Sequence, residues 1–294
     1  MREGFGLFDG VRLGALAFGL TLALATAPAR AGFDPQVGVE GSLGISASSP
    51  LFQGWASTVV DFNPGPQDIA NPGGPVANVG SPSAALGAIS SSVVSLGDGG
   101  WITLGFDAPI ANGAGFDFAV FENGFLMGAV GTYLAYLELA FVEVSSDGEN
   151  FFRFPSTSLT QTDAQVGGFG PLDARDLDNL AGKHIGGYGT GFDLDDLVGV
   201  SPLLDVNNVI QVRIIDVVGS IDPAFGSYDS HGNIINDPYA TPFGSSGFDL
   251  AGVGVINFAS PAAVPEPSSL ALGLCGLVAL AAVSRRARSA KPRG

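Results

Sequence analysis

The stretch "AFVEVSSDGENFFRF" (residues 140–154) decides how the central part of this chain folds. Its two ends are rich in β-branched and aromatic residues, which favour strands. Between them, Asp147 and Gly148 supply the dipeptide that tight hairpin turns prefer, because glycine adopts positive φ without strain. The stretch therefore predicts an antiparallel β-hairpin.

Short strands between turn residues continue on both sides of this hairpin. The chain contains 44 glycines and 19 prolines, and long helical periodicity is missing. Strands are expected at 101–106, 116–122, 137–145, 151–154, 209–217 and 248–258. Short helices are plausible only at 177–183 and 194–198, the proline-rich stretch 61–83 is expected to be an ordered loop or a linker, and the glycine-rich "GYGTGF" (187–192) follows no expected strand. The pattern predicts an all-β fold, a β-sandwich or jelly roll with long Gly/Pro-rich loops.

Together with "VIQVRIIDV" (209–217), the hairpin resembles the strand pattern of galactose-binding-like, discoidin-type β-sandwich domains. The resemblance implies a scaffold that carbohydrate-binding modules share with many structural domains, so it does not by itself specify a function. The block from "GDGGWITLGF" (97–106) to "GFDLAGVGVIN" (247–257) resembles uncharacterised bacterial cell-surface proteins. Some of these are associated with outer-membrane uptake of vitamins, including cobalamin.

The N-terminus has the features of a secretory signal peptide. Arg2 and Arg12 precede an almost wholly apolar stretch at 13–27, and Ala29 and Ala31 place small residues where signal peptidase reads them. Cleavage is expected after Ala31. The alternative is an N-terminal core helix.

The C-terminus contains a short apolar segment followed by positive charge. Residues 268–283 carry no charge, and at about 1.5 Å per residue they would reach about 24 Å, less than the roughly 30 Å hydrocarbon core of a bilayer. Arg285, Arg286 and Arg288 follow directly and would stay in the cytoplasm. The segment is therefore expected to be a single hydrophobic helix that only marginally spans the inner membrane.

Pro265, Glu266 and Pro267 stand in front of this helix, and the whole tail resembles the PEP-CTERM sorting signal. The resemblance implies a substrate of exosortase in an exopolysaccharide-producing Gram-negative bacterium, which is cleaved near the Pro-Glu-Pro and transferred to the cell surface, outer membrane or extracellular matrix. A permanent transmembrane anchor is the alternative. The expected organisation is a signal peptide at 1–31, a β-sandwich domain at 32–260 and the sorting segment at 261–294, with signal peptidase and exosortase as processing partners.

Composition excludes several classes of function. The single cysteine, Cys275, lies in the tail, so the exported domain has no disulfide, cysteine nucleophile or thiolate metal site. Residues 32–264 contain four basic and 25 acidic side chains, which gives a formal charge of −21. Such a charge excludes nucleic-acid binding and would repel anionic polysaccharide unless divalent cations bridge the two. The combination of an acidic composition, export and the absence of disulfides indicates that the domain binds calcium.

Three acidic loops are candidate calcium sites, because calcium prefers carboxylate, amide and carbonyl oxygens. They are "LDARDLDN" (172–179), "FDLDD" (192–196) and "DSHGNIIND" (229–237). The candidate ligands in these loops are Asp173, Asp176, Asp178, Asn179, Asp193, Asp195, Asp196, Asp229, Asn233 and Asp237. The alternative is that these residues form turns and helix caps.

Catalytic signals are weak. The two histidines, His184 and His231, are expected in loops, and neither stands in a recognisable catalytic motif. Two carboxylates could hydrolyse a glycosidic bond, with Glu122, Glu138 and Glu143 as candidates, although each is also explained as a strand residue.

Three tyrosines, Tyr188, Tyr228 and Tyr239, are expected in loops, where they could line one rim and stack on a ligand. The sequence thus predicts an exported surface or matrix protein with a non-catalytic binding or structural role, which engages polysaccharide with calcium. The alternatives are capture of a small nutrient such as cobalamin and glycan hydrolysis.

Overall fold

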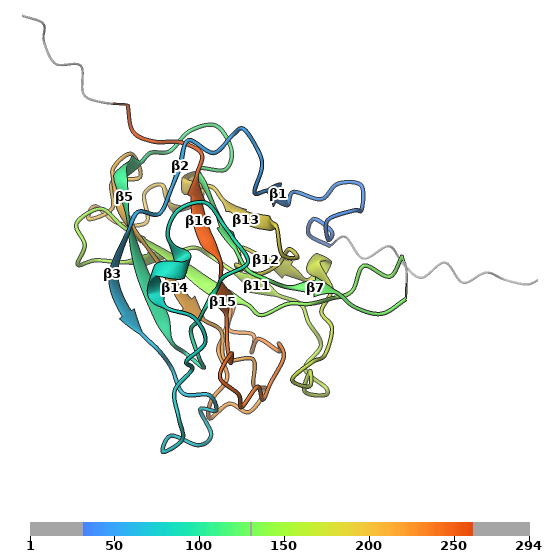
Figure 1. Ribbon diagram of the computed structural model, residues 1–294. Helices are drawn as coiled ribbons and strands as arrows, with labels where there is room; N and C mark the ends of the chain where they lie inside the picture. Colours follow the sequence, from blue (N-terminus) through green and yellow to red (C-terminus); the bar gives the residue numbers. More distant parts are fainter. Residues whose placement is uncertain (1–31, 130, 261–294) are drawn as a thin grey trace, which may run out of the picture. The chain divides into compact units, whose positions relative to one another are not determined.

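The computed structural model describes residues 32–129 and 131–260 of the 294-residue chain. Within these ranges the protein consists of two five-stranded antiparallel sheets and three two-stranded ones (Figure 1). The helices in the same ranges are three short 3-10 helices: η1 (Pro82–Ala85), η2 (Ala174–Asp176) and η3 (Leu194–Leu197). The expectation of an all-β class is confirmed. The expected signal peptide and C-terminal helix lie outside the described residues, and no helix inside them is both long and apolar enough to cross a membrane.

One five-stranded sheet contains the hairpin expected from the sequence. Its strands, in spatial order, are β10 (Phe152–Arg153), β9 (Ala140–Ser145), β14 (Val209–Asp216), β5 (Trp101–Ile110) and β3 (Thr58–Asn63). β9 pairs antiparallel with β10, so that Val144 lies opposite Phe152, and Gly148 in the turn has a φ of 79°. The hairpin prediction is therefore confirmed.

The other five-stranded sheet contains shorter strands with small and aromatic residues. In spatial order they are β1 (Ile45–Ser46), β13 (Tyr188–Phe192), β6 (Phe118–Phe121), β16 (Gly252–Val255) and β2 (Gly54–Trp55). The two-stranded pairs are β11 (Thr157–Ser158) with β12 (Leu177–Asp178), β15 (Asp249–Leu250) with β4 (Val94–Ser95), and β7 (Phe125–Leu126) with β8 (Ala135–Tyr136).

A single hydrophobic cluster takes side chains from both five-stranded sheets. Ile102 and Val142 belong to one sheet, and Phe118 and Phe192 belong to the other. The rings of Phe118 and Phe192 stack with centroids 5.5 Å apart, and Phe154 packs edge-on against both. Burial of such side chains is the main favourable contribution to folding.

The structure differs from the sequence expectations in four segments. The strand β13 falls in the glycine-rich stretch that was expected to be a loop. Its glycines let aromatic rings lie on the strand, since a Cβ on Gly189 would be 2.8 Å from Phe121 and one on Gly191 would overlap the ring of Phe116. The expected helix at 177–183 is wrong, because it begins with β12, and the segment expected at 194–198 forms only η3. The stretch 61–83 begins in β3 and continues as a loop in which Pro66 pairs with Val76.

Candidate functional site

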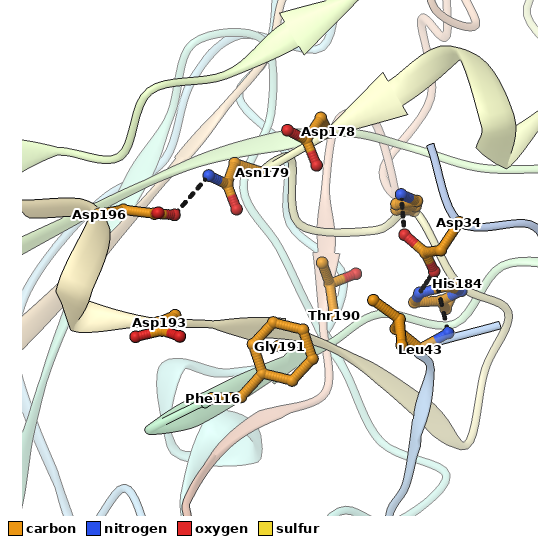
Figure 2. A pocket seen from close by; sticks show the side chains of 11 residues that line it. Asp34, Leu43, Phe116, Asp178, Asn179, His184, Thr190, Gly191, Asp193 and Asp196 are labelled. Atoms are coloured by element: carbon orange, nitrogen blue, oxygen red, sulfur yellow. Dashed lines mark hydrogen bonds and ion pairs between the residues drawn. The ribbon is translucent and has the colours of Figure 1, made fainter. Parts of the chain in front are cut away.

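An acidic cavity of about 320 Å³ opens beside β13 (Figure 2). It joins two of the acidic loops that the sequence had suggested separately. The residues that line it are Asp34, Leu43, Phe116, Asp178, Asn179, Lys183, His184, Thr190, Gly191, Asp193 and Asp196. We call this place the acidic cavity.

Local structure explains how two loops meet at the acidic cavity. Asp193 caps η3 by accepting the N–H of Asp195 at 2.9 Å, which turns the chain directly after β13. Asn179 follows β12 with a φ of 47°, a conformation that asparagine tolerates better than most residues. Its side-chain amide donates to Asp196 Oδ2 at 2.9 Å and so links the two loops.

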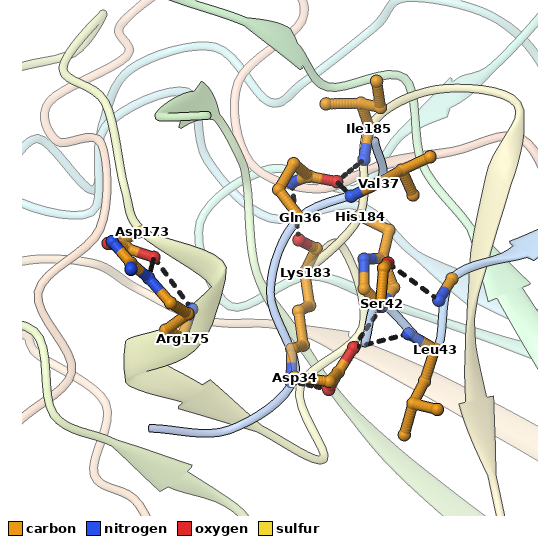
Figure 3. A network of polar contacts seen from close by, with 11 residues as sticks. Asp34, Gln36, Val37, Ser42, Leu43, Asp173, Arg175, Lys183, His184 and Ile185 are labelled. Atoms are coloured by element: carbon orange, nitrogen blue, oxygen red, sulfur yellow. Dashed lines mark hydrogen bonds and ion pairs between the residues drawn. The ribbon is translucent and has the colours of Figure 1, made fainter. Parts of the chain in front are cut away.

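One wall of the acidic cavity is a pre-organised ion-pair network (Figure 3). Lys183 and His184, each 2% exposed, both contact Asp34, and His184 Nε2 lies 3.3 Å from its Oδ2. Gln36 holds this segment by donating to the Lys183 carbonyl at 3.0 Å and accepting the N–H of Ile185 at 3.1 Å. Burial alone would raise the pKa of Asp34, but the hydrogen bond with His184 and the charge of Lys183 outweigh it and lower the pKa to about 2.

The carboxylates of the opposite wall form no ion pair among the described residues. Burial raises the pKa of Asp178, and the carboxylates of Asp34 and Asp196 raise it further against the opposing effect of Lys183. Burial and neighbouring carboxylates likewise raise the pKa of Asp193. This wall therefore favours ligands that donate hydrogen bonds or carry positive charge.

Two side chains that line the acidic cavity have a buried polar atom without a hydrogen-bond partner among the described residues, His184 at Nδ1 and Thr190 at Oγ1. Thr190 is 5% exposed, and Figure 2 shows its side chain among those that line the cavity. Such orphaned hydroxyls are rare in folded proteins because leaving a buried polar group unpaired costs free energy. Phe116, placed against Gly191, adds an apolar surface to the lining.

The other candidate calcium ligands lie outside the acidic cavity. Asp173 forms an ion pair with Arg175, and Asp195 accepts from Asn112 at 2.6 Å. Asp176 belongs to η2. Of the ten residues predicted as ligands, the structure places Asp178, Asn179, Asp193 and Asp196 in the acidic cavity.

The loop at 229–237 is organised by its own aspartates. Asp229 accepts the backbone N–H groups of Ser158, His231 and Asn233, and a further bond from the Asn233 side chain. Burial raises its pKa, but these hydrogen bonds outweigh burial and lower it. Asp237 is buried and accepts a backbone N–H at 3.0 Å. Both carboxylates therefore hold backbone segments in place.

The three tyrosines predicted as ligand contacts do not line the acidic cavity. Tyr188 lies in β13, Tyr228 is exposed opposite Ile234, and the Tyr239 hydroxyl donates to Asp68 at 3.1 Å. Their role in ligand binding stays a prediction.

The glutamates considered for hydrolysis occupy two kinds of environment. Glu143 pairs with Arg153 on the hairpin, as expected of a strand residue. Glu122 and Glu138, in contrast, are buried at the ends of β6 and β8. This burial could not be predicted from the residues on either side of each glutamate, because it depends on the tertiary fold.

Comparison with known proteins adds no assignment. The sequence matches no protein-family model. It also has no significant match among curated proteins. Within residues 32–129 and 131–260, no group of three or more His, Cys, Asp or Glu side chains is arranged to hold a metal ion.

Proposed function

We propose that the protein is an exported surface protein whose acidic cavity binds a saccharide without altering it chemically. The observation that carries the proposal is the buried, unpaired hydroxyl of Thr190 on the cavity wall. A ligand hydroxyl would complete its hydrogen bonding, and the carboxylates of Asp178 and Asp193 would accept further hydroxyl donors.

The remaining lining suits the same ligand class. Phe116 and Leu43 offer apolar surface for the C–H face of a sugar ring, while Asn179 can both donate and accept. The volume of about 320 Å³ is at the small end of the range of roughly 300–1,000 Å³ found for small-molecule sites. A ligand as large as cobalamin exceeds it, so this cavity does not favour the vitamin-capture alternative.

The fold and the proposed export signals are consistent with this function but do not specify the ligand. Two antiparallel sheets that share one core are consistent with a β-sandwich, an architecture that serves many binding modules. The signal peptide and the PEP-CTERM-like tail that we propose would bring the domain to a surface where exopolysaccharide is present. Export by this route remains part of the proposal.

The test is a glycan array with the purified full-length protein, followed by calorimetric titration of the best ligand. Asp196→Ala removes a carboxylate that lines the acidic cavity, whereas Asp195→Ala removes the adjacent exposed carboxylate, which does not line it. We expect binding about 10- to 100-fold weaker for Asp196→Ala, because one charge-assisted hydrogen bond contributes about 1.5–3 kcal/mol. Absence of glycan binding, or equal loss in both variants, would contradict the proposal, and cleavage of the bound glycan would indicate the hydrolase instead.

A further inference from the structure

Glu122 and Glu138 lie close together beside the short pair of strands β7 and β8. In that pair Phe125 lies opposite Tyr136. Glu122 lies three residues before Phe125 and Glu138 lies two residues after Tyr136, so both flank the same end of this antiparallel pair. Two acidic residues 16 positions apart in sequence are thus brought to the same end of one hairpin.

Both glutamates are almost completely removed from solvent, at 1% exposure for Glu122 and 4% for Glu138. Glu138 Oε1 accepts the hydroxyl of Tyr136 at 2.8 Å, and Glu122 Oε2 accepts the N–H of Gly124 at 2.5 Å. Glu122 Oε1 has no hydrogen-bond partner among the described residues. Burial raises the pKa of Glu138, and the carboxylate of Glu122 is the strongest of the charges that raise it further, consistent with their closeness.

The Glu122 carboxylate and the backbone of β8 pack closely against Gly124. A Cβ on Gly124 would lie 2.6 Å from the carbonyl oxygen of Tyr136 and 2.9 Å from Glu122 Oε2. The Tyr136 carbonyl oxygen and Glu122 Oε2 therefore lie on the same side of Gly124, and a larger residue at position 124 would overlap them. Asn123, which is exposed, gives water access to this region.

Two further acids face the pair but already have neutral hydrogen-bond partners. Asp249 accepts from the hydroxyl of Ser95 and from Asn123 at 3.1 Å. Asp237 accepts a backbone N–H at 3.0 Å. Both contribute negative charge near Glu122, whose unpaired Oε1 is the oxygen left without a partner.

No basic side chain of the described residues is free to neutralise this charge. All four lysines and arginines there are held elsewhere: Arg153 by Glu143, Arg175 by Asp173, Lys183 by Asp34 and Arg213 by Thr103. The two histidines contact Asp34 and Thr157. Buried carboxylates persist only when they are protonated, paired with a cation or bound to a metal.

We propose that Glu122 and Glu138 hold one calcium ion, with the Tyr136 carbonyl and the Asn123 side-chain oxygen as further ligands. This site is separate from the acidic cavity and from the loops in which the sequence suggested calcium. Calcium accepts six to eight carboxylate, amide, carbonyl and water oxygens in flexible geometry, which matches the mixture of groups found here. Because only two carboxylates bind, the affinity falls in the range of extracellular modules, with Kd about 10⁻⁴–10⁻³ M.

The experiment uses the purified full-length protein, depleted with EDTA and titrated with calcium chloride alone. The wild type is expected to bind one ion at this site by calorimetry, and saturating calcium should raise its Tm by several degrees. Glu122→Gln and Glu138→Gln keep the side-chain volume, so each should fold and lose both signals. Glu143→Gln is the matched control, because Glu143 pairs with Arg153 on the hairpin, and it should behave as wild type.

Three results would overturn the proposal. One is a wild type that neither binds calcium nor shifts its Tm. Another is a Glu122→Gln or Glu138→Gln variant that keeps the full response, which would indicate that the pair is simply protonated. The third is loss of the response in Asp196→Ala instead, which would place the ion in the acidic cavity. Saccharide binding is measured separately, so failure of this proposal leaves the proposed function open to its own test.

Discussion

Two buried threonines show how much depends on a single hydrogen bond. Thr103 in β5 is 1% exposed, and its hydroxyl accepts from Arg213 Nε at 3.0 Å. Thr190 in β13 is 5% exposed, and its hydroxyl has no partner among the described residues. Both threonines lie in strands, and valine has a similar shape and a similar preference for strand conformation, so a Thr→Val change mainly removes the hydroxyl. The two positions should therefore respond in opposite directions to the same change.

We expect Thr190→Val to raise the free energy of unfolding by about 1 kcal/mol, because it removes a buried polar group that no other group satisfies. Thr103→Val should lower it by about 1 kcal/mol, because it leaves the Arg213 donor unpaired. Urea unfolding of both variants measures the difference. The same Thr190→Val protein should bind saccharide more weakly, and a loss of stability in it would show that the hydroxyl is satisfied in the folded protein.

Among the elements, β13 does most to build the acidic cavity. Thr190 and Gly191 come from the strand itself, the segment before it carries Lys183 and His184, and Asp193 follows it. Its glycines are required because the rings of neighbouring aromatic residues occupy the places that Cβ atoms would take. Glycine has a low intrinsic preference for strands, and in β13 this disadvantage is offset by close packing against residues that are distant in the sequence.

Gly191→Ala should therefore destabilise the protein by about 1–3 kcal/mol, since the new methyl group would overlap the ring of Phe116. Saccharide affinity should also fall, because displacement of Phe116 alters the lining of the acidic cavity. The matched control is Gly167→Ala, where nothing lies within 4 Å of the new Cβ, and its change should stay within about 0.5 kcal/mol. Thermal unfolding of both variants measures the two stability changes. Equal changes in Gly191→Ala and Gly167→Ala would contradict the packing explanation.

The elements also show what could be predicted from the sequence. Strands with local β-branched patterning, such as β5 and β14, were predicted because their own residues favour extended structure. β13 was not predicted, because the reason for its glycines is tertiary: they leave room for the rings of Phe116 and Phe121. The acids at 178 and 193 were flagged by composition.

Other parts of the acidic cavity had no local signal. Asp34 and Phe116 reach it through tertiary contacts over long sequence separations, and Thr190 looks like an ordinary strand residue until its missing partner is seen. The burial of Glu122 and Glu138 was hidden for the same reason.

At the scale of the whole molecule, the excess of acidic residues extends into the interior. Burial raises the pKa of Asp98 to about 6, with Asp68 adding to the effect against a hydrogen bond from Ile69. Burial also raises the pKa of Asp216 and Asp237 well above the usual value. Groups with a raised folded-state pKa bind protons more tightly when folded, so the stability they contribute is lost as pH rises.

The opposite holds for Asp34, whose lowered pKa contributes stability above about pH 4 that is lost as pH falls towards 2. In EDTA, the free energy of unfolding should therefore be largest near pH 4 and decline from there towards pH 8. For Asp98 the difference between 3.8 and about 6 corresponds to roughly 3 kcal/mol.

Asp98→Asn should remove the part of the decline that falls between pH 4 and pH 6, because the amide does not titrate and its oxygen can still accept from Ile69. Asp34→Asn is the contrasting variant, since it should change the slope only below pH 4. Urea unfolding at pH 3, 4.5, 6 and 8 measures these slopes, and a wild type whose stability rises from pH 4.5 to 8 in EDTA would contradict the raised pKa values. Added calcium should flatten the decline above pH 6, because an ion at Glu122 and Glu138 replaces the protons that otherwise neutralise the pair.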